Sequence, residues 1–357
     1  MIRDLVRPEL RDFTPYNPKV VPYKVKIDAN ESPFELPEKI RMKLADYFTK
    51  GPELNLYPDT NSNELRKVLA SYWDIDYDGV IVGSGSDQLI QAITNVFVGK
   101  GDKVVCPEPT FDMYRFYTAI AGGIVIKIPL KEDKGFVYDI NEFIETSNKE
   151  NAKVVFLCSP NNPTGGLIPL GDIEKIAKAL SKSIIVVDEA YAEFSRETAI
   201  SLVKRYNNLI VLRTFSKAYG LAGIRCGYSL SSVEMADEIN KVKIPFNISS
   251  LSQLVAKLVF EEREERNKEI EYIKLQRDYL MEELKKIKGI HPYPSEANFI
   301  LLRVSDAGKV CRLLLERGVL VRSFGSVPVL ENFFRISIGN KEQNDIFLEE
   351  LKSILSC

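Results

Sequence analysis

Short apolar runs alternate with helical patterns over the first two thirds of the chain, and this rhythm constrains the fold more than any other feature. The runs are rich in valine and isoleucine, which is typical of strands buried on both faces of a mostly parallel sheet. They occupy residues 80–82, 104–106, 154–158, 184–187 and 209–212. Amphipathic segments such as residues 171–181 separate several of them. The sequence therefore predicts an α/β fold with a doubly wound central sheet.

The pattern changes after residue 246. A charged stretch at residues 250–288 predicts a connecting helix with a solvated face. Further strands are expected at 298–304, 319–323 and 333–338, and helices at 306–317 and at the C-terminus. With 357 residues, the chain is long enough for two hydrophobic cores. We expect an N-terminal arm at residues 1–29 that packs with the small domain, a large domain at 30–246 and a smaller α+β domain at 247–357.

Composition narrows the classes of function. Lys and Arg number 48 against 50 Asp and Glu, so the charge favours neither nucleic acid nor anionic membranes. No stretch approaches the roughly 20 apolar residues of a membrane span, and no signal peptide is visible. The five cysteines lack close paired spacing, which fits free thiols in a reducing compartment. We expect a cytoplasmic protein that acts on small molecules.

The chain has a single histidine, His291, expected in a strand or turn near the surface. A lone histidine supplies neither a metal cluster nor a catalytic triad. No metal site is therefore expected, and lysine or tyrosine must handle protons at neutral pH.

Polar clusters follow three of the predicted strands, at residues 159–165, 188–191 and 213–217. Parallel strands end at one edge of the sheet, where open α/β folds bind ligands. Asp188 at the end of an apolar strand needs a partner. A neighbouring lysine in a structural ion pair is one candidate. The pyridinium nitrogen of pyridoxal phosphate (PLP) is the other, and its protonation makes the ring an electron sink.

The ten residues 216–225, SKAYGLAGIR, combine a hydroxyl, an amine and a guanidinium among small side chains. Lys217 can form an imine with an aldehyde, its pKa being lowered by nearby cations and limited access of water, while Ser216 and Arg225 can hold phosphate oxygens. The turn GSGSD at residues 83–87 precedes an amphipathic helix, whose N-terminus can also bind phosphate. Simple helix capping by Ser86 or Asp87 is the alternative.

Taken together, these blocks resemble the class I/II aminotransferases of PLP fold type I, which have an aspartate-aminotransferase-like fold. More closely, the chain is similar to the histidinol-phosphate aminotransferase family. The matching segments cover nearly the whole chain and lie at residues 28–33, 57–59, 83–87, 162–165, 188–191, 213–228, 245–247 and 297–299.

The resemblance implies that Lys217, Asp188 and Tyr191 carry the catalysis. It pairs Asp188 with the pyridine nitrogen, places Asn162 and Tyr191 on the ring 3-oxygen, and stacks Phe111 on the ring. The family usually has tyrosine at position 111, but stacking uses the π-face and does not need the hydroxyl. A plain core role for Phe111 stays open.

The resemblance also implies a set of phosphate contacts from five residues of one chain. These are the amides of Ser86 and Asp87, the hydroxyls of Thr214 and Ser216, and the guanidinium of Arg225. Tyr57 is expected to reach the phosphate from a second subunit, which implies a homodimer with shared active sites.

By the same resemblance, Arg335 binds a substrate anion and Arg322 helps to bind substrate phosphate, with structural roles as the alternative. Tyr16 and Asn30 resemble residues that close over the substrate. The segment 30–34 lacks a glycine that often follows in this family, so substrate identity is less constrained than the cofactor.

The expected reaction is a ping-pong transamination between L-histidinol phosphate and 2-oxoglutarate, which gives imidazole acetol phosphate and L-glutamate in histidine biosynthesis. Two arginines, Arg322 and Arg335, suit a phosphate on one substrate and a carboxylate on the other. The alternatives are an aromatic amino acid aminotransferase, a threonine-phosphate decarboxylase-like PLP lyase, and a PLP-binding sensor module.

Overall fold

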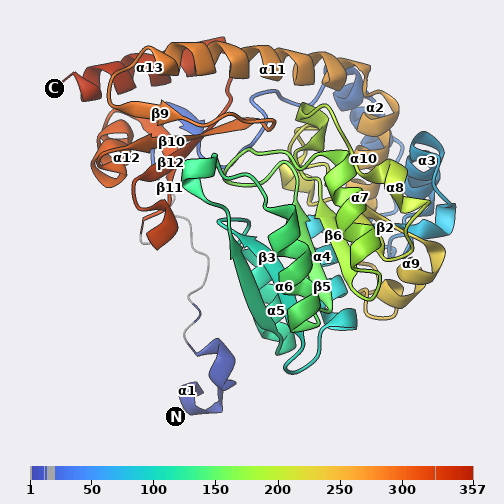
Figure 1. The fold of residues 1–357 in the computed structure, drawn as a ribbon. Helices are drawn as coiled ribbons and strands as arrows, with labels where there is room; N and C mark the ends of the chain where they lie inside the picture. Colours follow the sequence, from blue (N-terminus) through green and yellow to red (C-terminus); the bar gives the residue numbers. More distant parts are fainter. Residues whose placement is uncertain (1, 12, 14–20, 326, 357) are drawn as a thin grey trace.

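The computed structural model describes residues 2–11, 13, 21–325 and 327–356 (Figure 1). Strands of the described residues form a seven-stranded sheet and a five-stranded sheet. The α/β architecture predicted from the sequence is confirmed. None of the described helices is long and apolar enough to cross a membrane.

The larger sheet has the order β2-β8-β7-β6-β5-β3-β4. Its strands are β2 (Val80–Gly83), β3 (Lys103–Glu108), β4 (Ile124–Pro129), β5 (Val154–Cys158), β6 (Ile184–Asp188), β7 (Leu209–Thr214) and β8 (Gly227–Leu230). All neighbouring pairs are parallel except those of β8, which runs antiparallel to both β7 and β2. Each predicted apolar run falls on one of these strands, whereas β4 and β8 were not predicted.

Helices cover both faces of the larger sheet. The helices before, between and directly after its strands are α1 (Ile2–Leu5), α2 (Glu38–Thr49), α3 (Asn63–Trp73), α4 (Gly85–Phe97), α5 (Met113–Ala121), α6 (Ile140–Glu150), α7 (Leu170–Ala179), α8 (Ile200–Val203) and α9 (Val233–Asn240). Successive strand residues face opposite sides of a sheet. In β6, Val187 packs in a cluster with α6, α7 and α8, whereas Val186 packs in one with α4, α5 and α9. Asp188, two residues after Val186, faces the same side of the sheet as Val186.

The smaller sheet has the order β1-β11-β12-β10-β9. Its strands are β1 (Val25–Ile27), β9 (Ile290–Pro292), β10 (Phe299–Val304), β11 (Val319–Ser323) and β12 (Phe333–Ser337), accompanied by α12 (Ala307–Glu316) and α13 (Lys341–Leu355). β1 pairs in parallel with β11, so residues 25–27 extend a sheet built otherwise from the C-terminal part. The domain boundaries after residues 29 and 246 stay a prediction.

The prediction of a single connecting helix at residues 250–288 is wrong in one respect. The structure has two helices there, α10 (Ser250–Glu261) and α11 (Glu264–Lys285). Glu262 leaves the helical conformation between them and accepts hydrogen bonds from Lys39 and Lys43. Ion pairs to α2 thus accompany the break, and α10 packs against α2 and α3 while α11 runs along the smaller sheet.

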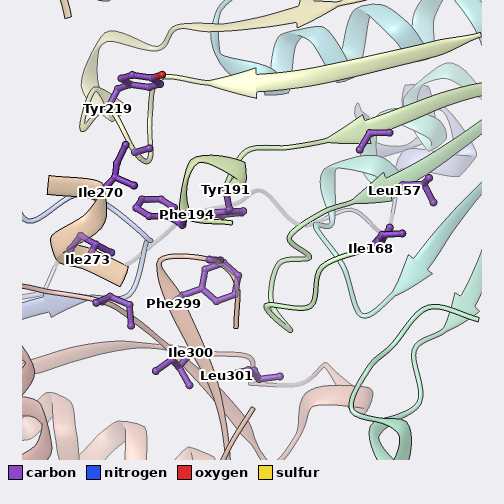
Figure 2. Close-up of a cluster of buried hydrophobic side chains, with 14 of the residues drawn as sticks. Leu157, Ile168, Tyr191, Phe194, Tyr219, Ile270, Ile273, Phe299, Ile300 and Leu301 are labelled. Carbon is purple, nitrogen blue, oxygen red and sulfur yellow. The ribbon is translucent and has the colours of Figure 1, made fainter. Parts of the chain in front are cut away.

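A continuous apolar cluster joins the two sheets (Figure 2). Figure 2 labels Leu157, Ile168, Tyr191, Phe194 and Tyr219 from the larger part and Ile270, Ile273, Phe299, Ile300 and Leu301 from α11 and β10. The rings of Tyr191 and Phe299 meet edge to face, with centroids 5.0 Å apart. Packing between the sheets therefore fixes the position of Tyr191.

We expect Leu280→Ala in α11 to lower the free energy of unfolding by about 3 kcal/mol, because the side chain is fully buried and its removal leaves a cavity. Leu275 on the same helix is 66% exposed, so Leu275→Ala should change stability by no more than about 0.5 kcal/mol. Denaturant unfolding of both variants checks this. Equal losses would show that α11 is not anchored by its buried face.

Candidate active site

Five strand ends meet at one edge of the larger sheet. Because β8 is antiparallel to both neighbours, β2, β3, β5, β6 and β7 all point the same way. Following their carboxyl ends are, in turn, the N-terminus of α4, Phe111, Asn162, the segment from Asp188 to Tyr191, and the segment from Thr214 to Lys217. The predicted convergence of polar clusters at this edge is confirmed.

Lys217 lies half-buried in the turn after β7. Its Nζ donates to the carbonyl oxygen of Ala29 at 2.9 Å and lies 5.9 Å from the ring centroid of Tyr191. Burial, and then the positive charge of Arg335, lowers the pKa of Lys217 to about 8. About a tenth of the amine is therefore neutral at pH 7, and this neutral form is the one that imine formation and proton abstraction require.

Asp188 is buried at the end of β6. Its Oδ2 accepts from the hydroxyl of Tyr114 at 2.7 Å, and Oδ1 accepts from the amide of Ala190 at 3.1 Å. No ion pair with a lysine occurs among the described residues, so the structural pairing considered for Asp188 is wrong. Burial raises the pKa of Asp188 to about 6 despite these two hydrogen bonds. The site holds a carboxylate that lacks a cation.

Asn162 and Tyr191 are tied to elements outside the larger sheet. Arg335 of β12 donates to Oδ1 of Asn162, so the amide nitrogen of Asn162 is the end that can donate to a ligand. Asn30 donates from Nδ2 to the Tyr191 hydroxyl at 3.0 Å. Asn30 is buried and has a left-handed backbone conformation, with φ 54°. Its backbone amide donates to Ser337 Oγ at 2.8 Å.

The two candidate substrate arginines lie directly opposite each other. Arg322 of β11 and Arg335 of β12 are register partners in an antiparallel pair, so their side chains leave the same face of the smaller sheet. Arg335 is buried and also donates to the carbonyl oxygen of Asp28 at 2.7 Å, whereas Arg322 is half-buried. Two arginine side chains therefore leave the smaller sheet at one position of the β11–β12 pair.

Hydroxyls and a guanidinium surround the N-terminus of α4. Thr214 Oγ1 and Ser216 Oγ lie 3.0 Å apart, and Arg225 Nη2 lies 2.9 Å from Asp87 Oδ2. The N-cap residue is Ser84 and it makes no side-chain capping bond, so capping by Ser86 or Asp87 does not occur. The first-turn amides of a helix have no partner within it, which leaves those of Ser86 and Asp87 suited to an anion.

Two glycines shape this cradle. A Cβ at Gly227 in β8 would lie 2.6 Å from the amide nitrogen of Ser86, and a Cβ at Gly85 would lie 2.7 Å from Arg225 Nη2. Gly85 also has φ +74°, which disfavours any other residue. Only a chain without side chains at these positions can bring β8, α4 and Arg225 together.

Three remaining candidates differ in how the structure places them. Phe111 is half-buried, with its ring edge-on to Tyr114 at 5.8 Å. Tyr57 is 82% exposed and stacks on Phe246 at 4.6 Å. Tyr16 lies outside the described residues.

Two residues of the site, Tyr114 and Ser337, were not predicted from the sequence. Tyr114 occupies an apolar position of an amphipathic helix, and its contact with Asp188 joins residues 74 positions apart. Ser337 contacts Asn30, 307 positions away. No local pattern predicts either contact, because both depend on how separate elements pack.

The residues present fit PLP. The cradle at α4 offers amides, hydroxyls and Arg225 to a phosphate. Asp188 is a buried carboxylate that a protonated ring nitrogen would complement, and the amine of Lys217, with its lowered pKa, suits an aldehyde. Asn162 and Tyr191 could donate to the ring oxygen.

Comparison with known proteins agrees with this geometry. Residues 22–351 match the family model for aminotransferase class I and II. The chain is 50% identical to the histidinol-phosphate aminotransferase of Ruminiclostridium cellulolyticum over 99% of each chain. It is 44% identical to that of Caldanaerobacter subterraneus over the full length of both.

A solved structure shares the fold. The histidinol-phosphate aminotransferase of Sinorhizobium meliloti, crystallised in complex with pyridoxal-5'-phosphate, superimposes with a TM-score of 0.87 at 25% identity over 98% of this chain and 97% of that one. The chain belongs to the class I and II aminotransferases, PLP-dependent enzymes that move amino groups between small molecules.

Proposed function

We propose that this enzyme transfers the amino group of L-histidinol phosphate to 2-oxoglutarate, giving imidazole acetol phosphate and L-glutamate in histidine biosynthesis. The names of its relatives support this substrate. The observation that carries the proposal is the register pairing of Arg322 with Arg335. Two adjacent guanidinium groups suit a pocket that binds a phosphate from one substrate and a carboxylate from the other in turn.

The cofactor, when bound, supplies an electron sink for charge that develops at the substrate α-carbon. Asp188 would hold the ring nitrogen in its protonated state, and Asn162 and Tyr191 would donate to the ring 3-oxygen. The amides of Ser86 and Asp87, with Thr214, Ser216 and Arg225, would bind the phosphate. Phe111 would pack on the ring face, which orients the ring without a hydrogen bond.

Lys217 would carry the covalent link and the proton. Nζ of Lys217 is the group that takes the proton from the α-carbon of the amino donor, and its lowered pKa keeps part of the amine unprotonated for this task. Asn30 would close over the substrate, since it is bonded to Tyr191 and Ser337. We keep Tyr16 as a second closing residue on the resemblance alone.

We further propose a homodimer with shared sites. Tyr57 is highly exposed for an aromatic residue, and it stacks on Phe246, which is 44% exposed. Leu56 and Ile244 beside them are more than half exposed. An apolar patch of this kind marks a surface that a partner covers. A second copy would bring its Tyr57 to the phosphate of this chain.

We also propose that the protein acts in the cytoplasm, a reducing compartment. Cys106, Cys158, Cys226 and Cys311 are buried free thiols. Burial raises the pKa of the Cys158 thiol to about 12, which keeps it inert.

The raised pKa of Asp188 predicts a stability effect in the cofactor-free protein. Between its ordinary pKa of 3.8 and about 6, the folded state binds more protons than the unfolded state, so stability falls as pH rises through this window. Asp188→Asn removes that cost and should raise the free energy of unfolding at pH 7.5 by about 3 kcal/mol. The gain in the free energy of unfolding should shrink towards pH 4. The same variant should bind PLP more weakly and turn over more slowly than the wild type. Denaturation of cofactor-free protein at both pH values checks this, and a gain that is equal at both would contradict it.

Tyr57→Phe and Lys217→Ala together test the shared site. Lys217→Ala alone should abolish turnover, and Tyr57→Phe alone should weaken PLP binding. In a mixed dimer with shared sites, one site carries both defects and the other carries neither, so mixing should restore normal PLP affinity and activity at one site. If Tyr57 served its own chain, no site would recover. Failure to recover after demonstrated subunit exchange would reject the shared site, as would a monomer in solution.

A substrate panel tests the reaction itself. The purified enzyme should convert histidinol phosphate far better than histidinol, phenylalanine or threonine phosphate, with glutamate formed from 2-oxoglutarate. Arg322→Gln should raise the KM for histidinol phosphate at least about tenfold, because a charged hydrogen bond to phosphate is lost. Preference for phenylalanine would instead indicate an aromatic aminotransferase, and release of carbon dioxide from threonine phosphate would indicate a lyase.

A further inference from the structure

Tyr114 of α5 is a fully buried tyrosine whose hydroxyl reaches the proposed partner of the cofactor ring. The hydroxyl donates to Asp188 Oδ2 at 2.7 Å. Its ring stacks on Phe156 of β5, with centroids 4.5 Å apart and planes 8° apart. The backbone of Tyr114 accepts from Thr118 Oγ1 at 2.7 Å. Packing therefore fixes the ring, and the position of the hydroxyl follows from it.

The surroundings of Asp188 otherwise disfavour a charge. Asp87 of α4 and Glu189, the residue directly after β6, are acidic, and Cys158 of β5 is the register partner of Asp188. Tyr138 and Tyr191 also lie close enough to interact with it. Among the groups that act on Asp188 in the described residues, the Tyr114 hydroxyl and the Ala190 amide favour the ionised carboxylate. Of these two donors, only the Tyr114 hydroxyl belongs to a side chain, so a substitution can remove it.

We propose that Tyr114 is a positioning residue that keeps Asp188 ionised and oriented, so that the carboxylate can pair with the protonated ring nitrogen of PLP. This inference rests on the proposed pairing of Asp188 with that nitrogen. A hydroxyl that donates to a carboxylate favours its charged form, and the bond is strong because the site excludes water. Tyr114 also meets Phe111 edge-on, so the same side chain supports the ring proposed to pack on the cofactor.

The role predicts a pH signature. A buried carboxylate that loses one of its two donors titrates at higher pH, because only the Ala190 amide then opposes the effect of burial. Protonated Asp188 has no charge to offer the ring nitrogen. PLP affinity should therefore fall on acidification in every variant that keeps Asp188, and Tyr114→Phe should move the midpoint of that fall to higher pH.

The experiment compares Tyr114→Phe with Tyr138→Phe in the full chain. Tyr138 is a matched control, since it is also buried and its hydroxyl donates at 3.0 Å to the backbone oxygen of Cys158 rather than to Asp188. The cofactor is removed by dialysis, and PLP is titrated back between pH 5.5 and 8.5. Tyr114→Phe should shift the midpoint upwards by about one pH unit and weaken PLP binding about threefold at pH 6.5 and about eightfold at pH 5.5, with near-normal affinity at pH 8.5. Tyr138→Phe should keep the wild-type midpoint.

A profile of Tyr114→Phe that superimposes on the wild type, or a loss of affinity equal at all pH values, would overturn the proposal. Asp188→Asn separates this failure from that of the pairing itself. If Asp188→Asn leaves the PLP affinity and its pH dependence unchanged, the pairing is wrong and the role of Tyr114 falls with it. If Asp188→Asn abolishes the pH dependence but Tyr114→Phe does not shift it, only the role of Tyr114 is rejected. In the double variant, Tyr114→Phe should add no pH-dependent effect.

Discussion

Asp188, at the end of β6, and Lys217, in the turn after the neighbouring β7, are withdrawn from water without being paired with each other. Burial acts on them in opposite directions, raising the pKa of the carboxyl to about 6 and lowering that of the amine to about 8. Each is held by a neutral group, the hydroxyl of Tyr114 for Asp188 and the carbonyl of Ala29 for Lys217. A direct ion pair would relieve both costs but would also occupy both groups. The free-energy cost of burying the two groups is therefore retained at a position where a ligand can remove it.

The short segment from Asp28 to Asn30 connects the two sheets at this position. Three consecutive carbonyl oxygens accept from different elements: that of Asp28 from Arg335, that of Ala29 from Lys217 and that of Asn30 from Asn298. The left-handed conformation of Asn30 turns the chain so that its side chain reaches Tyr191. Residues near the N-terminus thus determine how the small sheet meets Lys217.

Local sequence patterns predicted whatever is fixed by one strand and the turn after it. Asp188, Lys217 and Asn162 each follow a buried strand, so parallel topology alone brings them together. Contacts between elements could not be predicted in this way. Tyr114 meets Asp188 only because α5 packs on the same face of the sheet as the Asp188 side of β6. The break at Glu262 was missed for a similar reason, since a charged helical pattern does not show that two lysines of α2 hold this residue.

Arg335 would connect the proposed binding of a substrate anion to the protonation of Lys217. It is bonded to Asn162, and its positive charge is the second largest influence that lowers the pKa of Lys217, after burial. A carboxylate or phosphate bound at Arg335 would neutralise part of that charge and raise the pKa of Lys217. Without an anion at Arg335, the lowered pKa keeps part of the amine neutral, as imine formation and proton abstraction both require. An anion bound at Arg335 would shrink that neutral fraction. Arg335 would thus couple the charge bound on the smaller sheet to the protonation of Lys217 on the larger one.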